Sequence, residues 1–369
     1  MNRMKLGEIL SVKHGWAFKG EYFAEDGEQS ILTPGNFFEK GGFKPNNGKE
    51  RYYTGVYPKE YLCHKGDLIV AMTQQAEGLL GSTALVPEND KYLHNQRIGL
   101  ITCDEKRLNK LFAYYLFMTK SVREQLERSS SGTKVKHTSP EKIYDVEVEI
   151  PDVISQQKIA NLLWSVDEKI ANNKAINDNL SAMAYDIYMH TFFSKKPNAK
   201  LKDILTEAEK SAIQVGEAKT SNGEYPFFTS GTTILKWNEP FVDGRNCFLN
   251  TGGNADVKFY VGKAAYSTDT WSISAKSEMS DYLYLMLFSI KPELDQKFFQ
   301  GTGLKHLQKP LLKDRPIYIP EKMELEGFNR QVMPMFDIIS ENTRENQQLT
   351  SLRDWLLPML MNGQATISD

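Results

Sequence analysis

The sequence has little of what marks secreted, membrane-bound or metal-binding proteins. Its 369 residues include only three cysteines, Cys63, Cys103 and Cys247. These are too few and too scattered for a disulfide framework or a zinc site. No apolar run is long enough to cross a membrane, and the first residues lack the apolar stretch of a signal peptide. We therefore expect a cytoplasmic protein with no metal site.

An excess of one charge is also missing. The 45 Lys and Arg residues nearly balance the 47 Asp and Glu residues, which gives a formal net charge of −2. The total therefore does not mark a strongly basic nucleic-acid binder, although a balanced total can hide opposed patches. The acidity lies in residues 321–369, while residues 1–150 and 200–320 each carry a net charge of +1.

The usual cofactor and catalytic motifs are absent. The sequence contains no glycine-rich dinucleotide loop after a strand, no Walker loop and no Gly-x-Ser-x-Gly elbow. The six histidines are scattered, and none adjoins a nucleophile in a catalytic pattern. These absences argue against a stand-alone enzyme.

What the sequence does contain is a long internal repeat. Residues 5–10 resemble residues 200–205, an offset of 195, and Gly-Thr-x-x-Lys-His at 132–137 returns at 301–306, an offset of 169. The second copy is therefore shorter in its globular part, while its ends are kept. A variable middle between matched ends predicts one scaffold that carries two different surfaces.

Each copy ends in a long helical pattern. Apolar residues recur three or four apart from Ser155 to about Phe193, and again in the C-terminal segment. This heptad-like spacing favours packing of one helix on another. Asn173 and Asn342 fall at equivalent positions in the two stripes. They either fix the register of the helix seam or are two exposed asparagines on slightly rotated helices.

The globular parts mix strands and helices, so we predict an α+β fold. Apolar patterns predict a strand within residues 66–73, a helix over residues 106–127 and a strand over residues 144–150. A second helix is predicted over residues 280–290. Pro334 and Pro358 predict a kink or a shortening of the last helix. The expected segments are a globular domain at 1–152, a long helix at 153–194, a second globular domain at 195–321 and a long helix at 322–369.

Several polar loops are candidate binding sites. The repeated Gly-Thr-x-x-Lys-His loop offers backbone N–H groups, hydroxyls and cations that suit phosphate, or it is a tight turn with solvated lysines. Gln74 and Gln75 follow a predicted strand, where amides can read adenine or be ordinary surface groups. The candidate nucleic-acid-binding residues are Gln74, Gln75, Ser131, Gly132, Thr133, Lys134, Lys136, His137, Thr229, Ser230, Thr270, Gly301, Thr302, Lys305 and His306.

This pattern resembles the specificity (S) subunit of type I restriction–modification systems, over essentially the whole chain. The likeness rests on the alternation of globular units and long helices and on the order of short motifs. These motifs are Lys5–Ile9, Lys200–Ile204, Gly66–Ile69, Gly81, Ile150–Ala160, Ile319–Pro320 and Leu349–Pro358. One departure is that Glu326–Phe328 replaces Gln156–Lys158, which leaves the first turn of the second helix in question.

The resemblance implies a function in DNA recognition. Each globular unit would be a target-recognition domain that reads one half of a split, asymmetric site. The long helices would pack as an antiparallel coiled coil with pseudo-two-fold symmetry and set the spacer. Two modification subunits would dock on the helices and methylate adenine with S-adenosylmethionine. Restriction subunits would add cleavage that needs ATP and Mg²⁺, and this chain itself would bind no cofactor and catalyse nothing.

Two alternatives stay open from the residues alone. The chain could be a scaffold that uses its duplicated domains to hold two partner proteins without DNA. It could also be a stand-alone DNA-modifying enzyme, against which the missing cofactor loop argues. The repeated polar loops favour DNA over a protein partner.

Overall fold

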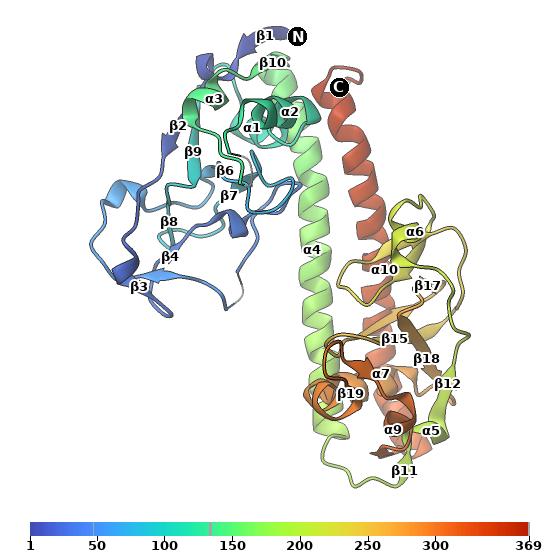
Figure 1. Cartoon of the computed structure of the whole chain (residues 1–369). Coiled ribbons are helices and arrows are strands. Elements are labelled where there is room, and N and C mark those ends of the chain that lie inside the picture. Colours follow the sequence, from blue (N-terminus) through green and yellow to red (C-terminus); the bar gives the residue numbers. More distant parts are fainter. Residues whose placement is uncertain (47, 133–134, 368–369) are drawn as a thin grey trace. The chain divides into compact units, whose positions relative to one another are not determined.

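The computed structural model describes residues 1–46, 48–132 and 135–367. The chain forms two compact units, unit 1 (Met1–Glu168 with Thr350–Asp369) and unit 2 (Lys169–Leu349). Two long helices, α4 (Val153–Thr191) and α10 (Lys322–Met361), are drawn in green and red in Figure 1. Each unit contains part of both helices, so the long helices belong to the two hydrophobic cores.

Unit 1 is built from short strands and helices that precede α4. Its strands are β1 (Asn2–Lys5), β2 (Leu10–His14), β3 (Phe23–Ala24), β4 (Ser30–Ile31), β5 (Tyr52–Tyr53), β6 (Leu68–Ala71), β7 (Thr83–Leu85), β8 (Tyr92–Leu93), β9 (Ile98–Cys103) and β10 (Glu147–Ile150). Its shorter helices are η1 (Leu6–Glu8), η2 (Gly20–Tyr22), η3 (Pro34–Asn36), η4 (Lys59–Tyr61), α1 (Lys110–Leu116), α2 (Lys120–Ser129) and α3 (Pro140–Tyr144).

Unit 2 repeats this plan between the two long helices. Its strands are β11 (Ala199–Lys200), β12 (Leu205–Glu207), β13 (Tyr225–Phe228), β14 (Leu235–Trp237), β15 (Arg245–Asn250), β16 (Val257–Val261), β17 (Ala265–Tyr266), β18 (Thr270–Ala275), β19 (Phe299–Gln300), β20 (His306–Leu307) and β21 (Pro316–Ile317). Its shorter helices are α5 (Leu201–Ile204), α6 (Val215–Lys219), α7 (Ser280–Ser289), α8 (Lys291–Glu293), the π-helix η5 (Leu294–Phe298) and α9 (Lys309–Lys313).

The main sheet has the same topology in both units. Its strand order is β2-β9-β6-β7 in unit 1 and β12-β18-β15-β16 in unit 2, and all pairs are antiparallel. A second sheet also repeats, as β5-β4-β8 and β14-β13-β17, each with one parallel pair. Unit 1 adds the edge strand β3 to this sheet. The α+β fold and the internal repeat predicted from the sequence are therefore confirmed.

The repeat extends to single hydrogen bonds at the start of each unit. The backbone N–H of Lys5 donates to Glu8 Oε1 at 2.8 Å, and that of Lys200 donates to Asp203 Oδ2 at 2.8 Å. Strand β1 pairs with β10, as β11 pairs with β21. The first strand of each globular unit therefore pairs with its last strand, in the same way in both units.

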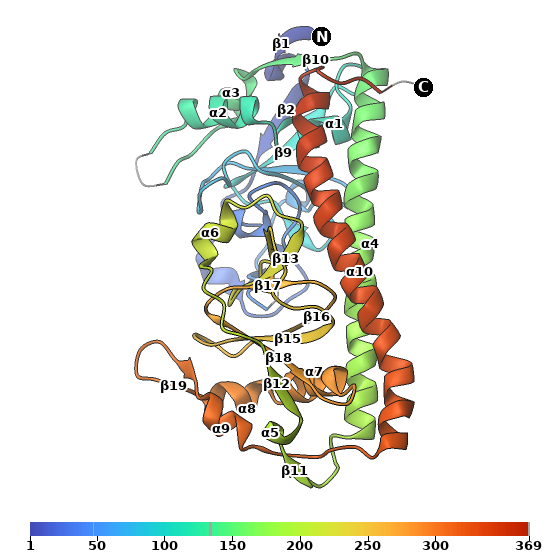
Figure 2. The ribbon, with the colours of Figure 1, turned by 90° about the vertical axis from the view of Figure 1, so that its right-hand side faces the viewer.

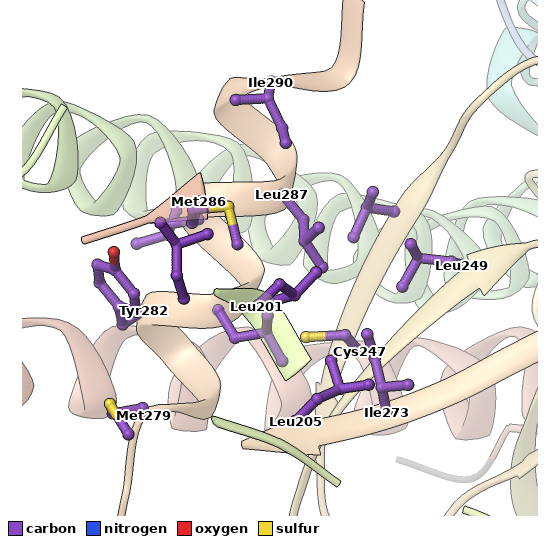
Figure 3. Packing of buried hydrophobic residues seen from close by; sticks show 14 of the residues in the cluster. Leu201, Leu205, Cys247, Leu249, Ile273, Met279, Tyr282, Met286, Leu287 and Ile290 are labelled. Atoms are coloured by element: carbon purple, nitrogen blue, oxygen red, sulfur yellow. The ribbon is translucent and has the colours of Figure 1, made fainter. Parts of the chain in front are cut away.

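Each core buries one face of the long helices. In unit 2, Tyr188 of α4, Phe192 directly after α4, and Phe328 and Val332 of α10 are at most 4% exposed. Figure 3 shows part of this core, where α7 side chains such as Leu287 pack with side chains from the main sheet such as Cys247. In unit 1, Leu163 of α4 belongs to the core. Part of each apolar stripe read from the sequence forms these buried faces, whereas Leu162, Met183 and Leu352 of the stripes are exposed.

The helix predicted over residues 106–127 is instead two helices, α1 and α2. Thr119 breaks it, because its backbone is extended (φ −66°, ψ 146°). The carbonyls freed by the break keep partners, since the Thr119 hydroxyl donates to Leu116 O at 2.7 Å and Arg123 Nε donates to Phe117 O at 2.6 Å. The apolar pattern continues across the break, so periodicity alone does not reveal it. The predicted helix over 280–290 is confirmed as α7.

Pro334 and Pro358 were expected either to kink the last helix or to shorten it, and the shortening is not observed, because α10 includes both prolines. Helix α10 begins before Pro334 and ends after Pro358. Figure 2 shows α10 as one continuous ribbon. Phe336 and Leu360 are buried near the two prolines, so packing against the cores compensates for the lost backbone hydrogen bonds. Within the described residues, no helix is long and apolar enough to cross a membrane.

Candidate nucleic-acid interface

Three segments of unit 1 meet beside the main sheet. The N–H of Gln74 donates to Lys136 O, that of Thr138 to Met72 O, and that of Met72 to Arg97 O, each at 2.9 Å. We call residues 72–75, 95–97 and 131–138 the loop junction of unit 1, of which 133 and 134 lie outside the described residues. The junction brings Gln74 and the Gly-Thr-x-x-Lys-His loop together, although they lie far apart in the sequence.

Unit 2 has a loop junction with the same three hydrogen bonds. The N–H of Gly253 donates to Lys305 O at 2.9 Å, that of Leu307 to Thr251 O at 3.0 Å, and that of Thr251 to Asp269 O at 2.9 Å. The loop junction of unit 2 consists of residues 251–254, 267–269 and 300–307. Gly253 thus takes the place of Gln74 and Asp269 that of Arg97. All six bonds join main-chain atoms, so the frame is shared while the side chains on it differ.

The repeated glycines close tight turns in both junctions. Gly132 has a φ of +99° and Gly301 a φ of +149°, a region that favours glycine. A Cβ atom at Gly132 would lie 2.1 Å from Val135 O, and one at Gly301 would lie 2.6 Å from Leu304 O. The tight-turn alternative considered from the sequence therefore accounts for the glycines. The turns also leave Ser131 and Thr302 exposed.

The repeated lysines are ion-paired. Lys136 Nζ contacts Glu127 Oε1, and Lys305 Nζ lies 2.8 Å from Asp295 Oδ2. The hydrogen bond from Lys305 and one from the Ala255 N–H lower the pKa of Asp295. Both lysine side chains remain about two-fifths exposed, at 36% and 40%. A phosphate can therefore reach each ammonium group, but it competes with the carboxylate.

The repeated histidines differ from each other in their contacts. His137 Nδ1 lies 3.0 Å from the hydroxyl of Thr73, while both His137 and His306 are exposed. Gln75 is exposed and Gln74 is half-buried. Both junctions therefore offer polar groups on a folded frame, which is the kind of surface that contacts DNA backbone and base edges.

Three other candidates lie apart from the junction contacts. Ser230 is exposed, and Thr229 is buried with its hydroxyl bonded to Gly231 N and Thr233 O. Both line a small cavity beside α6. Thr270 is buried, and its hydroxyl contacts Ser267 Oγ at 2.9 Å. Because the hydroxyls of Thr229 and Thr270 are engaged within the fold, we do not include these two residues in the interface.

Arg97 and Asp269 belong to the junctions but were missed by sequence reasoning. Each precedes a strand of the main sheet, β9 or β18, and each side chain is exposed. The signal that could have identified them is that each directly precedes the strand at the same position in its own main sheet, β9 in unit 1 and β18 in unit 2. That equivalence needs the sheet register, because the spacing between Arg97 and Asp269 differs from both offsets seen in the sequence.

Asn173 and Asn342 lie in the helix seam of unit 2, with two asparagines that the sequence analysis missed. Asn173 donates to Asn346 Oδ1 at 2.9 Å, and Asn342 donates to Asn177 Oδ1 at 2.8 Å. Partner numbers fall on α10 as they rise on α4, so the helices are antiparallel. The spacing of four within each helix could have identified the second pair. The sequence offset of 169 relates Asn173 to Asn342 and Asn177 to Asn346. The repeat therefore relates the Asn173–Asn346 hydrogen bond to the Asn342–Asn177 hydrogen bond, which is a local two-fold relation between the two helices.

Partly buried ion pairs and hydrogen bonds tie each globular part to the long helices. In unit 1, Arg353 Nη1 and the Tyr115 hydroxyl both donate to Asp167, each at 2.7 Å. In unit 2, Arg245 of β15 donates to Asp337 Oδ1 and to Met333 O of α10, at 2.6 and 2.8 Å. Arg245 also binds Asp281 of α7 through two bonds of 2.6 and 2.8 Å. Burial raises the pKa of Asp281, and its bonds with Arg245 oppose that rise. These links hold the frame of each junction against α4 or α10.

The described residues contain no group of three or more His, Cys, Asp or Glu side chains placed to hold a metal ion. Burial raises the pKa of Cys63 and of Cys103 to about 12, so neither thiol is activated. Burial also lowers the pKa of His94 to about 4. The arrangement that the two units share is therefore one of polar contact rather than of activated nucleophiles.

Comparison with known proteins identifies a family model and several relatives that match this chain. A family model for the "Type I restriction modification DNA specificity domain" matches residues 1–182 and again residues 195–351. The type I restriction enzyme MjaIX specificity subunit of Methanocaldococcus jannaschii is 22% identical over 301 residues, 70% of this chain and 69% of the relative. The HindI specificity subunit of Haemophilus influenzae is 21% identical over 402 residues, 81% of this chain and 86% of the relative.

The fold also has a solved counterpart. The crystal structure of a type I restriction–modification S subunit from M. genitalium superposes with a TM-score of 0.66 at 15% identity. The match covers 100% of this chain and 96% of that chain. It supports the duplicated α+β architecture with two long helices.

Proposed function

Because the chain belongs to the type I restriction–modification DNA specificity family, we propose that it selects the DNA sequence on which such a complex acts. Unit 1 reads one half of a split site, and unit 2 reads the other half. The chain carries no chemistry of its own in this role. The observation that supports this most directly is the duplicated loop junction, with one main-chain frame and two sets of side chains.

Different side chains on one frame favour an asymmetric site. Unit 1 presents Gln74 and Gln75, whose amides can pair with adenine. Unit 2 presents Gly253 and Asn254 at the equivalent positions. The lysines common to both junctions suit phosphate, which positions DNA without reading its sequence. Each unit would therefore hold the duplex in the same way and read different bases.

The long helices would dock the modification subunits. Exposed apolar residues stand on the long helices of both units, where they are available to contact such partners. In unit 1 these include Ile154 and Trp355, at 71% and 60% exposure, and in unit 2 they include Met183 and Met323, at 52% and 84%. Two modification subunits, one for each unit, would cover these residues.

The partners would supply the chemistry that this chain lacks. The modification subunits would bind S-adenosylmethionine and methylate adenine, and restriction subunits would use ATP and Mg²⁺ for cleavage. The near-neutral charge of the chain fits this division, because affinity from counterion release would come largely from the partners. A complex that acts on chromosomal DNA would work in the cytoplasm.

A methylation map tests the proposal. The chain is co-expressed with a type I modification subunit from the same host, and modified adenines in plasmid DNA are read by single-molecule sequencing. We expect one split, asymmetric motif with a fixed gap, which disappears when this chain is omitted. Methylation that does not depend on the chain would contradict the proposal and favour a protein scaffold.

A further inference from the structure

Arg97 and Asp269 occupy the same place in the two loop junctions. The Arg97 carbonyl accepts a hydrogen bond from Met72 N at 2.9 Å, and the Asp269 carbonyl accepts one from Thr251 N at 2.9 Å. Each residue immediately precedes a central strand of the main sheet, β9 or β18. The fold therefore presents an arginine in unit 1 where it presents an aspartate in unit 2.

Neither side chain is used by the fold. Arg97 and Asp269 are exposed, and no side-chain hydrogen bond or ion pair joins either one to another of the described residues. The repeated lysines of the junctions are engaged instead, Lys136 with Glu127 and Lys305 with Asp295. The guanidinium of Arg97 and the carboxylate of Asp269 thus have their full hydrogen-bonding capacity available to a ligand.

A pair of residues that distinguishes two half-sites must differ between the units. The lysines and histidines of the junctions do not meet this condition, because they are the same in both. Residues 97 and 269 do meet this condition, because Arg97 is positively charged and Asp269 is negatively charged. An exposed carboxylate on a DNA-binding surface is repelled by phosphates, so it is suited only to a base edge that donates hydrogen bonds.

Base chemistry then assigns a target to each side chain. The arginine fork donates two parallel hydrogen bonds to O6 and N7 of guanine, and a carboxylate accepts from the N4 amino group of cytosine. We propose that Arg97 and Asp269 are equivalent specificity-determining residues. Arg97 reads a guanine in the half-site of unit 1, and Asp269 reads a cytosine in the half-site of unit 2. This inference rests on the proposed function.

The test uses the full chain in complex with its modification subunits and a duplex library randomised at the motif positions. Bound and methylated sequences are counted for the wild type and for Arg97→Ala, Arg97→Lys and Asp269→Asn. We expect each Arg97 variant to lose the guanine preference at one position of one half by roughly ten-fold or more. Lysine fails as well, because it lacks the planar fork. Asp269→Asn is expected to relax one position of the other half only.

Matched controls separate this effect from a general change of charge. Arg51 in unit 1 and Glu239 in unit 2 are exposed and lie outside the junctions. Arg51→Ala and Glu239→Gln should therefore leave both half-sites unchanged. A change in one half alone also shows that the variant chain folds, since the other half is still read.

The contrary outcomes are distinct. Weaker binding to all sequences by Arg97→Ala, with recovery in Arg97→Lys, would identify a phosphate contact and overturn the assignment. Uniformly tighter binding by Asp269→Asn, with no change in base preference, would overturn its part. An unchanged motif in all variants would refute the inference while leaving the proposed function intact. A wild-type complex whose methylation ignores this chain would refute the proposed function itself.

Discussion

Asn173 of α4 donates a hydrogen bond to Asn346 of α10 across the helix seam of unit 2, at 2.9 Å. Asn173 is only 1% exposed. Its amide also donates to Glu345 Oε2 at 2.6 Å, and this bond, together with one from Lys169, lowers the pKa of Glu345. A buried amide that hydrogen-bonds to polar groups on the facing helix disfavours any shift of one helix along the other, because a shift would break these bonds.

Replacing Asn173 alone should destabilise this seam. Asn173→Leu leaves the Asn346 side chain without this partner, and the expected cost is about 1–3 kcal/mol. Thermal unfolding followed by circular dichroism measures the effect. Asn172→Leu, at an exposed neighbouring position, is the matched control. The double variant Asn173→Leu/Asn346→Leu should recover part of the loss, and equal effects of Asn173→Leu and the control would contradict the role in register.

The junction lysines should act on affinity and not on sequence. Lys136→Ala is expected to weaken DNA binding by the complex at all sequences and to reduce the salt slope by about one. Lys305→Ala should do the same from unit 2. Titrations at several salt concentrations measure both quantities. Lys106→Ala, at an exposed lysine outside the junction, should change neither, and a slope unaltered in Lys136→Ala would exclude a phosphate contact.

The carboxylate partners should have the opposite effect. Glu127→Gln removes the charge that competes for Lys136, so the complex should bind DNA more tightly than the wild type. The same salt titration checks this expectation. If Glu127→Gln instead weakened binding, the carboxylate would be needed to orient the lysine rather than to compete with DNA.

The two glycines of one loop should respond differently to alanine. Gly301→Ala places a Cβ 2.6 Å from Leu304 O at a positive φ, and the expected cost is about 1–3 kcal/mol within unit 2. The methylation motif should weaken in one half only. Gly303→Ala meets nothing within 4 Å and has no such φ, so it should be neutral. Equal melting temperatures and motifs for both variants would show that the turn is not constrained.

His94 predicts a pH dependence of stability. Burial lowers its pKa to about 4 from 6.5, so the unfolded chain binds a proton there before the folded chain does. The contribution of His94 is therefore fully present above pH 6.5 and is lost as the pH falls towards 4. The slope approaches about 1.4 kcal/mol per pH unit within that window.

Comparison of variants isolates this effect. His94→Gln should flatten the dependence between pH 6.5 and 4 relative to the wild type, measured as the unfolding midpoint in urea. His64→Gln, at a histidine whose side chain is 66% exposed, should leave the slope as it is. A wild-type slope retained in His94→Gln would assign the dependence to other groups.

The long helices and the repeat were predictable because they depend on local pattern. The apolar spacing predicted α4 over nearly its whole length. The break at Thr119 was not predictable in this way, because the apolar spacing continues across it. The shortening considered for Pro334 does not occur, because packing of α10 against the core outweighs the local preference of proline.

The candidate site was predicted only in part, for a related reason. The Gly-Thr-x-x-Lys-His loops repeat in sequence and could be found by alignment. Arg97 and Asp269 become equivalent only through the places of β9 and β18 in their own main sheets, which neither sequence offset displays. Thr270 looked available because its neighbours are polar, but its own hydroxyl is turned into the fold and bonded to Ser267.

The main-chain nature of the junction has an evolutionary consequence. The bond at residue 97 or 269 uses only its carbonyl oxygen, so a new side chain there disturbs no contact that maintains the fold. Most single mutations that alter recognition risk stability, but mutations at these two positions carry little of that risk. A lineage could therefore acquire a new target sequence in one half-site by a single codon change, while the other half and the helix seam stay as they were.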